Sequence, residues 1–265
     1  MLGAAMLATG CVAGFMAGLF GIGGGIIIVP VLEFTLGKLG VDPAIRMHVA
    51  VATSLAIIIP TSLSSARAHH QRQAVDMEIV KRWALFILGG ALAGAWIASQ
   101  VHSRVLAMVF ATFALLVALK MIVLPKSHNV TDGVPQAALV AVIPTTIGCL
   151  SSMMGIGGGT FSVIVLTLFN QPIHRAVGTA ALLGLFISLP GTMGFMVAGW
   201  NDARLPPGSL GYVSLLGFAL IAPVTVMTAP LGAKIAHSFS EKKLGMLFGI
   251  FLLLAATRMF YKALV

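Results

Sequence analysis

Charged side chains are scarce in this sequence: Asp, Glu, Lys and Arg together make up 9% of its 265 residues. A soluble domain carries about 25%, and a water-exposed surface as apolar as this chain would require promotes aggregation. The composition therefore excludes a soluble protein and indicates an integral membrane protein. Apolar stretches of about 20 residues favour helices, and the alternating pattern of a membrane β-strand is absent.

Cysteines are also rare, and acidic residues number only seven. The two cysteines, Cys11 and Cys149, lie inside apolar stretches without disulfide or metal-ligand spacing. We expect both to be core residues, and we expect neither a metal site nor a cofactor. The first positive charge is Lys38, so the charged start of an ordinary secretory signal peptide is missing.

The formal net charge is +9. In a soluble protein this excess would suggest nucleic acid as a partner, but here most Lys and Arg lie between apolar stretches. We therefore expect a lipid bilayer and no nucleic acid, with the charges setting membrane topology. If loop 66–82 faces the cytoplasm, ten positive charges lie inside against six outside, which places both termini outside. A weaker second interpretation is that a basic interior favours anionic cargo.

Ten apolar segments form two groups of five on either side of a polar stretch. They are 2–20, 24–37, 47–66, 79–99, 104–124, 137–154, 158–169, 175–199, 209–235 and 244–263. Segments 24–37 and 158–169 are shorter than the ~20 residues of a spanning helix, and they occupy the same place in each group. We predict a first repeat at 1–124, a linker at 125–136 and a second repeat at 137–265.

Two matched motifs support the repeat. FGIGGG at 20–25 matches MGIGGG at 154–159 with an offset of 134, and HVAVATS at 48–54 matches HRAVGTA at 174–180 with an offset of 126. Two matches in the same order indicate an internal repeat. Because five crossings are an odd number, the second half would enter the membrane inverted. The predicted fold is an all-α polytopic membrane bundle of two inverted repeats.

The glycine clusters predict broken helices, since glycine costs roughly 1 kcal/mol against alanine in a helix. A helix that restarts inside the membrane presents free N–H groups and the positive end of its dipole, which together bind an anion without a charged side chain. We expect the two restarts to meet near the midplane. The alternative is tight helix packing, which small residues also permit. The glycines that would open the two short helices are Gly23, Gly24, Gly25, Gly157, Gly158 and Gly159.

Small hydroxyl side chains accompany both clusters. A hydroxyl can donate a hydrogen bond to an anion, although in a membrane helix it often bonds its own backbone. The candidate binding hydroxyls are Thr53, Ser54, Thr160 and Thr179. Of these, Thr53 and Thr179 are favoured because the repeat matches them. Further hydroxyls in these segments are Thr61, Ser62, Ser64, Ser65, Ser151, Ser152, Ser162 and Ser188.

Two matched histidines are candidates for gating or proton coupling. His48 and His174 lie near segment ends, each close to an arginine, Arg46 or Arg175. Such a cluster can gate the entrance of a transport path or titrate near neutral pH. It can also simply anchor a helix end at the membrane interface.

One further coupling candidate is Glu33, the only acid within an apolar segment. An intramembrane carboxylate suggests a functional role such as proton coupling. Against this, the residue 134 positions later is Thr167, so the repeat does not duplicate the charge.

The twin GIGGG clusters, each followed by a short apolar run and then by an AV-G/A-T-S/A motif, resemble the TauE/SafE family of sulfite exporters and organosulfonate-linked permeases. The resemblance covers nearly the whole chain. It implies a transporter of small sulfur-containing anions in the inner membrane of a bacterium or archaeon, and not an enzyme. In one departure, Ala180 lacks the hydroxyl that Ser54 supplies, so strict symmetry of the site is not expected.

Together these observations predict a secondary transporter, an exporter of sulfite or organosulfonates. The anion would bind between the two glycine breaks while one half rocks against the other. An anion channel and a carrier of another small carboxylate or oxyanion remain as alternatives. The residues leave open the cargo, the direction, the coupling ion, a homodimer, and whether segments 24–37 and 158–169 span fully or re-enter.

Overall fold

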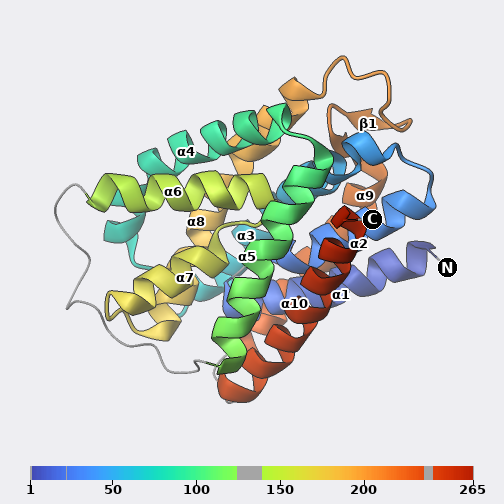
Figure 1. The fold of residues 1–265 in the computed structure, drawn as a ribbon. Helices are drawn as coiled ribbons and strands as arrows, with labels where there is room; N and C mark the ends of the chain where they lie inside the picture. Colours follow the sequence, from blue (N-terminus) through green and yellow to red (C-terminus); the bar gives the residue numbers. More distant parts are fainter. Residues whose placement is uncertain (1, 22, 124–138, 236–240, 265) are drawn as a thin grey trace.

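The computed structural model describes residues 2–21, 23–123, 139–235 and 241–264, which form ten α-helices and one short β-hairpin (Figure 1). The first half contains α1 (Leu2–Phe20), α2 (Gly25–Lys38), α3 (Pro43–His70), α4 (Met77–Gln100) and α5 (Ser103–Val123). The second half contains α6 (Leu139–Met154), α7 (Gly159–Leu168), α8 (Ile173–Ala198), β1 (Ser209–Leu210), β2 (Val213–Ser214), α9 (Leu215–Ile235) and α10 (Glu241–Leu264). The all-α prediction is confirmed, and the expected linker 125–136 lies outside the described residues.

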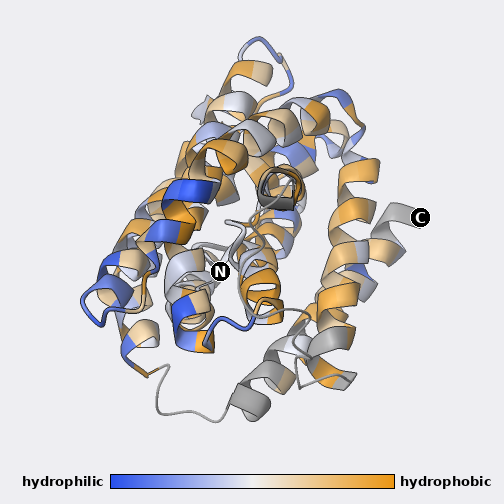
Figure 2. Ribbon diagram, turned by 90° about the vertical axis from the view of Figure 1, so that its left-hand side faces the viewer, coloured by the Kyte–Doolittle hydropathy of each residue, from blue (hydrophilic) through white to orange (hydrophobic). Residues whose placement is uncertain are grey.

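The surface of the bundle is apolar. Within the described residues, α3, α4, α8 and α9 are each long and apolar enough to cross a membrane. Large apolar side chains face outward from several helices; Leu85, Trp96 and Val197, for example, are 74%, 68% and 76% exposed. Figure 2 shows hydrophobic residues along most of the helices. Such a surface suits lipid and not water, as a multi-pass membrane protein requires.

Glycines bring two pairs of helices into very close contact. On α1, Gly18 lies directly against the backbone of Ala229 in α9, so a Cβ atom at this glycine would meet the Ala229 carbonyl oxygen. On α4, Gly94 lies against the backbone of Cys149 in α6 in the same way. Small residues allow membrane helices to approach this closely. In both pairs, the first helix of one half packs against the fourth helix of the other half.

The two central helices, α3 and α8, run antiparallel. The Oγ atom of Ser62 lies 2.7 Å from the position that a Cβ on Gly184 would take, whereas a Leu55 methyl group lies 3.0 Å from the corresponding position on Gly191. Residue numbers therefore rise along α8 as they fall along α3. These two helices are the third helices of their respective halves, so equivalent elements meet in opposite directions.

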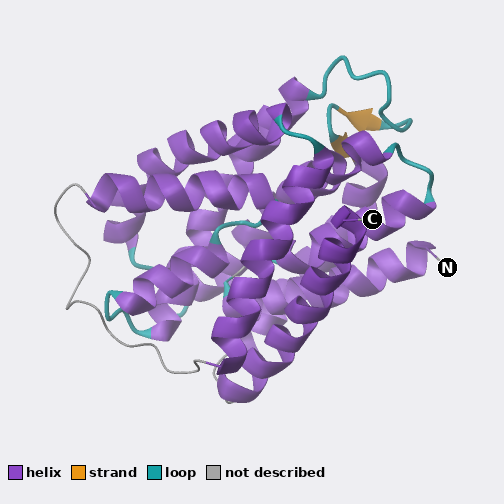
Figure 3. Cartoon of the chain, in the orientation of Figure 1, coloured by secondary structure: helices purple, strands orange, loops and turns teal. Residues whose placement is uncertain are grey.

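The expected apolar segment at 209–235 begins differently in the structure. Residues 209–214 form the hairpin, with Ser209 paired to Ser214 and Leu210 paired to Val213, and α9 begins only at Leu215 (Figure 3). Gly211 adopts a φ of +54°, which favours glycine over other residues and reverses the chain. The stretch is apolar enough to look like a helix, but its turn chemistry starts the helix later.

Candidate functional site

The two glycine clusters share two backbone positions and differ at a third. Gly21 and Gly155, 134 residues apart, have φ angles of +65° and +67°. Gly24 and Gly158, separated by the same offset, have φ angles of +76° and +68°. Glycine adopts this left-handed region without the strain that a side chain brings. Gly23 is also left-handed, with a φ of +74°, whereas its counterpart Gly157 is not, so the match between the motifs extends to part of the backbone of the two breaks.

The two left-handed glycines of the second break, Gly155 and Gly158, each have a defined structural role. The N–H of Gly155 donates to the carbonyl of Ser152, and the N–H of Ile156 donates to the carbonyl of Ser151. This is the Schellman arrangement that ends a helix with a left-handed glycine. Gly158 then begins the next helix, because it is the N-cap residue of α7. Gly24 is the corresponding N-cap of α2, so the short helices start where the glycines predict.

The two breaks contact each other directly. A Cβ atom added to Gly23 would lie 3.5 Å from the Cα of Gly157, and Gly25 lies against the carbonyl oxygen of Gly155. Ile58 covers both breaks, since its Cγ2 atom lies 3.1 Å from the Cβ position of Gly23 and 2.7 Å from that of Gly157. The structure thus brings the predicted glycines together, and it fills the space between them with one isoleucine from α3.

Each break also packs on the matched motif of the other half. Gly21 lies against the carbonyl of Val177 in α8, and the Cα of Val51 in α3 lies 2.9 Å from the Cβ position of Gly155. Ser54 donates a hydrogen bond of 2.7 Å to the Gly155 carbonyl. Ala180, the counterpart of Ser54, has no hydroxyl to make the equivalent bond. The two halves are therefore interlocked at the breaks, but not identically.

The two matched threonines occupy a different position. Thr53 accepts a hydrogen bond of 2.9 Å from the backbone N–H of Ser214, which directly precedes α9. Thr179 accepts one of 2.9 Å from the N–H of Asp76, the N-cap of α4. Each hydroxyl thus holds the loop before the fourth helix of the opposite half. Their predicted contact with an anion stays a prediction.

Other hydroxyls surround the second break. Thr160 and Ser162 lie in the first turn of α7, Ser151 lies in the last turn of α6, and Ser62 lies on α3. All four are at most 5% exposed, and their hydroxyl oxygens have no hydrogen-bond partner among the described residues. The Ser151 Oγ lies 3.4 Å from the Cβ position of Gly158. Of the four, only Thr160 is among the candidate binding residues named from the sequence; the others are recognised there simply as hydroxyls within apolar segments.

Glu33 and Arg46 are brought together. Oε1 of Glu33 lies 3.8 Å from an Nη atom of Arg46, and Oε2 lies 3.9 Å from an Nη atom of Arg258 in α10. Arg46 also donates to the carbonyl of Val41 through Nε and Nη2, at 3.1 and 2.7 Å. The Arg258 guanidinium lies 4.4 Å from the ring centroid of Phe34. The carboxylate of Glu33 therefore links α2 to α3 and α10.

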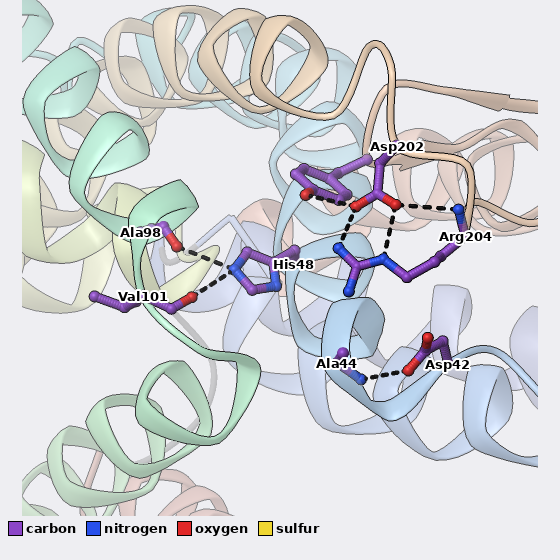
Figure 4. Close-up of polar contacts among 8 residues, drawn as sticks. Asp42, Ala44, His48, Ala98, Val101, Asp202 and Arg204 are labelled. Carbon is purple, nitrogen blue, oxygen red and sulfur yellow. Dashed lines mark hydrogen bonds and ion pairs between the residues drawn. The ribbon is translucent and has the colours of Figure 1, made fainter.

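The matched histidines differ in their surroundings. Nε2 of His48 lies 3.1 Å from the Ala98 carbonyl and 3.0 Å from the Val101 carbonyl at the end of α4 (Figure 4). Because carbonyl oxygens only accept, Nε2 carries the hydrogen in a neutral ring. His48 is 4% exposed, whereas His174 and Arg175 are exposed at the start of α8. Since α3 and α8 run antiparallel, the two histidines lie toward opposite ends of this helix pair.

A polar cluster near His48 was not predicted from the sequence. Arg204 donates to both carboxylate oxygens of Asp202, at 2.8 and 2.7 Å, and the Tyr212 hydroxyl donates to Asp202 at 3.1 Å. The hydrogen bonds from Arg204, together with the one from Tyr212, hold the pKa of Asp202 well below its usual range. Burial raises the pKa of Tyr212, whose ring centroid lies 5.3 Å from that of His48. This cluster fastens the loop between α8 and α9 over the start of α3.

Comparison with known proteins places these features in a family. Residues 6–259 match the family described as Sulfite exporter TauE/SafE. A probable membrane transporter protein of Haemophilus influenzae is 34% identical over 258 residues, covering 97% of each chain. Another, from Bacillus subtilis, is 27% identical over 98% of this chain and 97% of its own. A third, from Methanocaldococcus jannaschii, is 26% identical over 90% of this chain and 88% of its own. No solved structure matches the chain.

The family and these relatives are membrane transporters and not enzymes, and their similarity covers nearly the whole chain. The buried glycine breaks, the apolar surface and the interlocked halves belong to the matched region. The chain is a multi-pass membrane protein that belongs to the sulfite exporter TauE/SafE family.

Proposed function

We propose that the protein is a secondary carrier that exports a small sulfur-containing oxyanion, such as sulfite or an organosulfonate. The family description, which names sulfite export, supports this cargo. The observation that carries the proposal is the pair of glycine breaks, which share two left-handed positions and contact each other inside the bundle. An anion would bind at this pair, where helix starts supply N–H groups and a positive dipole end.

We propose that the two halves are inverted repeats that alternate access to the site. Three relationships support this. The central helices α3 and α8 run antiparallel, as inverted equivalents must. The pairing of α1 with α9 and the pairing of α6 with α4 are exchanged by the repeat. The breaks share left-handed glycines at two equivalent positions, Gly21 with Gly155 and Gly24 with Gly158. Transporters built this way open to either side by rocking one unit against the other around a fixed site.

We further propose that both termini lie outside the cytoplasm of a bacterium or archaeon, with the chain in the inner membrane. The support is the excess of Lys and Arg in the loops that this orientation places inside. In this orientation the Asp202–Arg204–Tyr212 cluster lies on the outer side, over the start of α3. Labelling of single cysteines introduced at exposed loop positions of intact cells, with a membrane-impermeant reagent, tests the orientation; labelling of the 66–82 loop from outside would reverse it.

A ligand panel on the purified protein in detergent tests the cargo. The panel contains sulfite, sulfate, thiosulfate, taurine, sulfoacetate, acetate and chloride. An anion at 100 times its dissociation constant stabilises the folded protein by about 2.7 kcal/mol. We expect a selective rise in melting temperature with one sulfur oxyanion or sulfonate. Stabilisation by none of them, or equally by chloride and all the others, would contradict the proposed cargo.

Flux in proteoliposomes separates a carrier from a channel. A carrier saturates with substrate and exchanges internal for external anion, because the site faces one side at a time. We expect trans-stimulation: unlabelled anion inside the vesicles should speed the uptake of labelled anion. Flux that rises linearly with concentration and shows no exchange would indicate an anion channel on the same scaffold.

A further inference from the structure

We propose that the anion site is asymmetric, and that the second break alone provides its donors through Ser62, Ser151, Thr160 and Ser162 around the start of α7. This inference deepens the proposed function and rests on it. It departs from a site shared equally between the two breaks, and it adds three residues to those that the sequence favoured. The ligand is a small oxyanion, whose several oxygens can each accept from a hydroxyl or a backbone N–H.

The four hydroxyls are buried and have nothing to bond within the described residues. Ser151 and Ser162 are 0% exposed, Ser62 is 1% and Thr160 is 5%. Buried polar atoms are nearly always hydrogen-bonded, so each such atom in a native protein needs an explanation. Four of them around one helix start share a single explanation, namely that their partner is a ligand.

The start of α7 adds backbone donors to the same place. The first N–H with a partner in this turn is that of Ser162, which donates to the Gly158 carbonyl at 2.8 Å. The N–H groups of Gly159, Thr160 and Phe161 precede it and lack an acceptor one turn back. The Ser151 Oγ lies 3.4 Å from the Cβ position of Gly158, so this hydroxyl is adjacent to the helix start. The Ser151 hydroxyl and the free backbone N–H groups therefore lie at the N-terminus of α7, and the Thr160 and Ser162 hydroxyls belong to its first turn.

Ser62 reaches the same break from α3. Its Oγ lies 2.7 Å from the Cβ position of Gly184, and the carbonyl oxygen of Gly157 lies 2.8 Å from that position. Because Gly184 has no side chain, both Ser62 and the backbone of Gly157 can pack directly against α8. The counterpart of Gly184 is Ile58, whose side chain fills the corresponding place over the glycines.

The first break shares two left-handed glycine positions with the second but not the same donors. The residues that correspond to Ser151, Thr160 and Ser162 at the offset of 134 are Ala17, Ile26 and Ile28. All three are buried and apolar, so they cannot donate to an anion. Ser188, which corresponds to Ser62 at the offset of 126, donates to the carbonyl of Leu185 at 3.4 Å. The unpartnered hydroxyls thus distinguish the second break as the binding side.

The donor set also indicates the charge of the ligand. Neither α6 nor α7 contains a charged residue, so the recognition at this break comes from neutral hydroxyls and from the helix dipole. Such donors favour a small anion of low charge, since a multiply charged one would lose more hydration than they replace. Neutral donors also allow release, which a carrier needs in every cycle.

The test compares anion affinity in wild type and four purified variants, measured by calorimetric titration in detergent with the anion that wild type binds best. The triple variant Ser151→Ala, Thr160→Val and Ser162→Ala copies the apolar character of the first break. Three lost hydrogen bonds of about 1 kcal/mol each predict an affinity about 100-fold weaker. The matched control is Thr167→Val on the same helix, because the Thr167 hydroxyl already bonds the carbonyls of Val163 and Ile164. This control should bind like wild type.

Two single substitutions at Thr160 still test the proposal if the triple variant fails to fold. Thr160→Val keeps the shape and loses the hydroxyl, and we expect about fivefold weaker binding. Thr160→Ser keeps the hydroxyl and should bind almost like wild type. Wild-type affinity in Thr160→Val and in the triple variant would overturn the asymmetric site while leaving the carrier intact. If wild type itself binds and transports no anion of the panel, the proposed function fails and the site fails with it.

Discussion

Ile58 of α3 and Gly184 of α8 lie 126 residues apart, which is the offset between the matched HVAVATS and HRAVGTA motifs, but only Ile58 has a side chain. The Ile58 Cγ2 atom lies 2.7 Å from the Cβ position of Gly157, so this side chain closes the space over the second glycine break from one side. On the other side Gly184 lets the Ser62 hydroxyl and the Gly157 carbonyl approach α8 closely. The second break therefore has an apolar side chain on one side and a hydroxyl on the other.

Truncating Ile58 should destabilise the contact between the breaks. Ile58→Ala removes a fully buried side chain, and such substitutions cost about 2–5 kcal/mol when the surroundings cannot collapse. Leu63→Ala on the same helix is the control, since Leu63 is 38% exposed and should cost much less. Melting temperatures in detergent measure the difference. Equal losses in the two variants would show that Ile58 is not a packing centre.

Removing an unpartnered hydroxyl should stabilise the protein when no anion is present. A buried polar group without a partner costs about 1–3 kcal/mol, and the Ser162 hydroxyl is such a group. Ser162→Ala should therefore raise the melting temperature of the anion-free protein and reduce the further rise that anion produces. Thr167→Val, whose hydroxyl is already bonded, should not raise it. A lower melting temperature in Ser162→Ala would mean that the hydroxyl has a structural partner.

The sequence predicted the two breaks because their signals are local. Glycine clusters, a repeated offset and two short apolar segments are readable without knowing how the helices are rotated. The direction in which each side chain points depends on that rotation. Thr53 and Ser54 are neighbours about 100° apart around α3, so Ser54 reaches the Gly155 carbonyl while Thr53 reaches the Ser214 N–H.

Two further features could not be predicted from the sequence, because they too depend on how the chain packs. The role of Ile58 depends on which helix lies over the glycines, and the residue itself is one apolar residue among many. The hairpin at 209–214 was assigned to an apolar segment because hydropathy does not register the left-handed conformation of Gly211. Both the position of Ile58 over the glycines and the hairpin at 209–214 depend on tertiary contacts, which only the three-dimensional structure shows.

The matched threonines should contribute unequally to stability. Thr53→Val leaves the N–H of Ser214 without its partner in a buried place, whereas Thr179→Val does the same for a partly buried N–H of Asp76. An unsatisfied buried donor costs about 1–3 kcal/mol, so Thr53→Val should lose more stability than Thr179→Val. Anion affinity measured on both variants tests the predicted binding role separately. Unchanged affinity would assign these threonines to the loops alone.

Neutralising Glu33 should lower the stability of the folded protein without abolishing transport. Glu33→Gln removes the charge that faces Arg46 and Arg258, and we expect a loss of roughly 1–3 kcal/mol, limited because Arg258 is half exposed. Glu78→Gln is the matched control, since its exposed pair with Arg82 should contribute about 0.5 kcal/mol or less. Flux in proteoliposomes should persist with an unchanged pH dependence. Loss of pH-driven flux in Glu33→Gln alone would instead establish proton coupling through this carboxylate.

The Asp202 cluster should give a stability difference that depends on pH. Hydrogen bonds from Arg204 lower the pKa of Asp202 in the folded protein, so the stabilisation is fully present above the unfolded pKa of about 3.9 and is lost as the pH falls toward the folded value. Asp202→Asn should therefore be less stable than wild type by about 1 kcal/mol or less between pH 5 and 8, because the pair is partly exposed. The difference should narrow below about pH 4, where wild-type Asp202 loses its advantage over the unfolded chain. Melting temperatures of both proteins across this range measure it, with Asp42→Asn as a control, whose carboxylate accepts one backbone N–H at 2.8 Å. A gap that widens as the pH falls would show that Arg204 does not stabilise the Asp202 carboxylate in the folded protein.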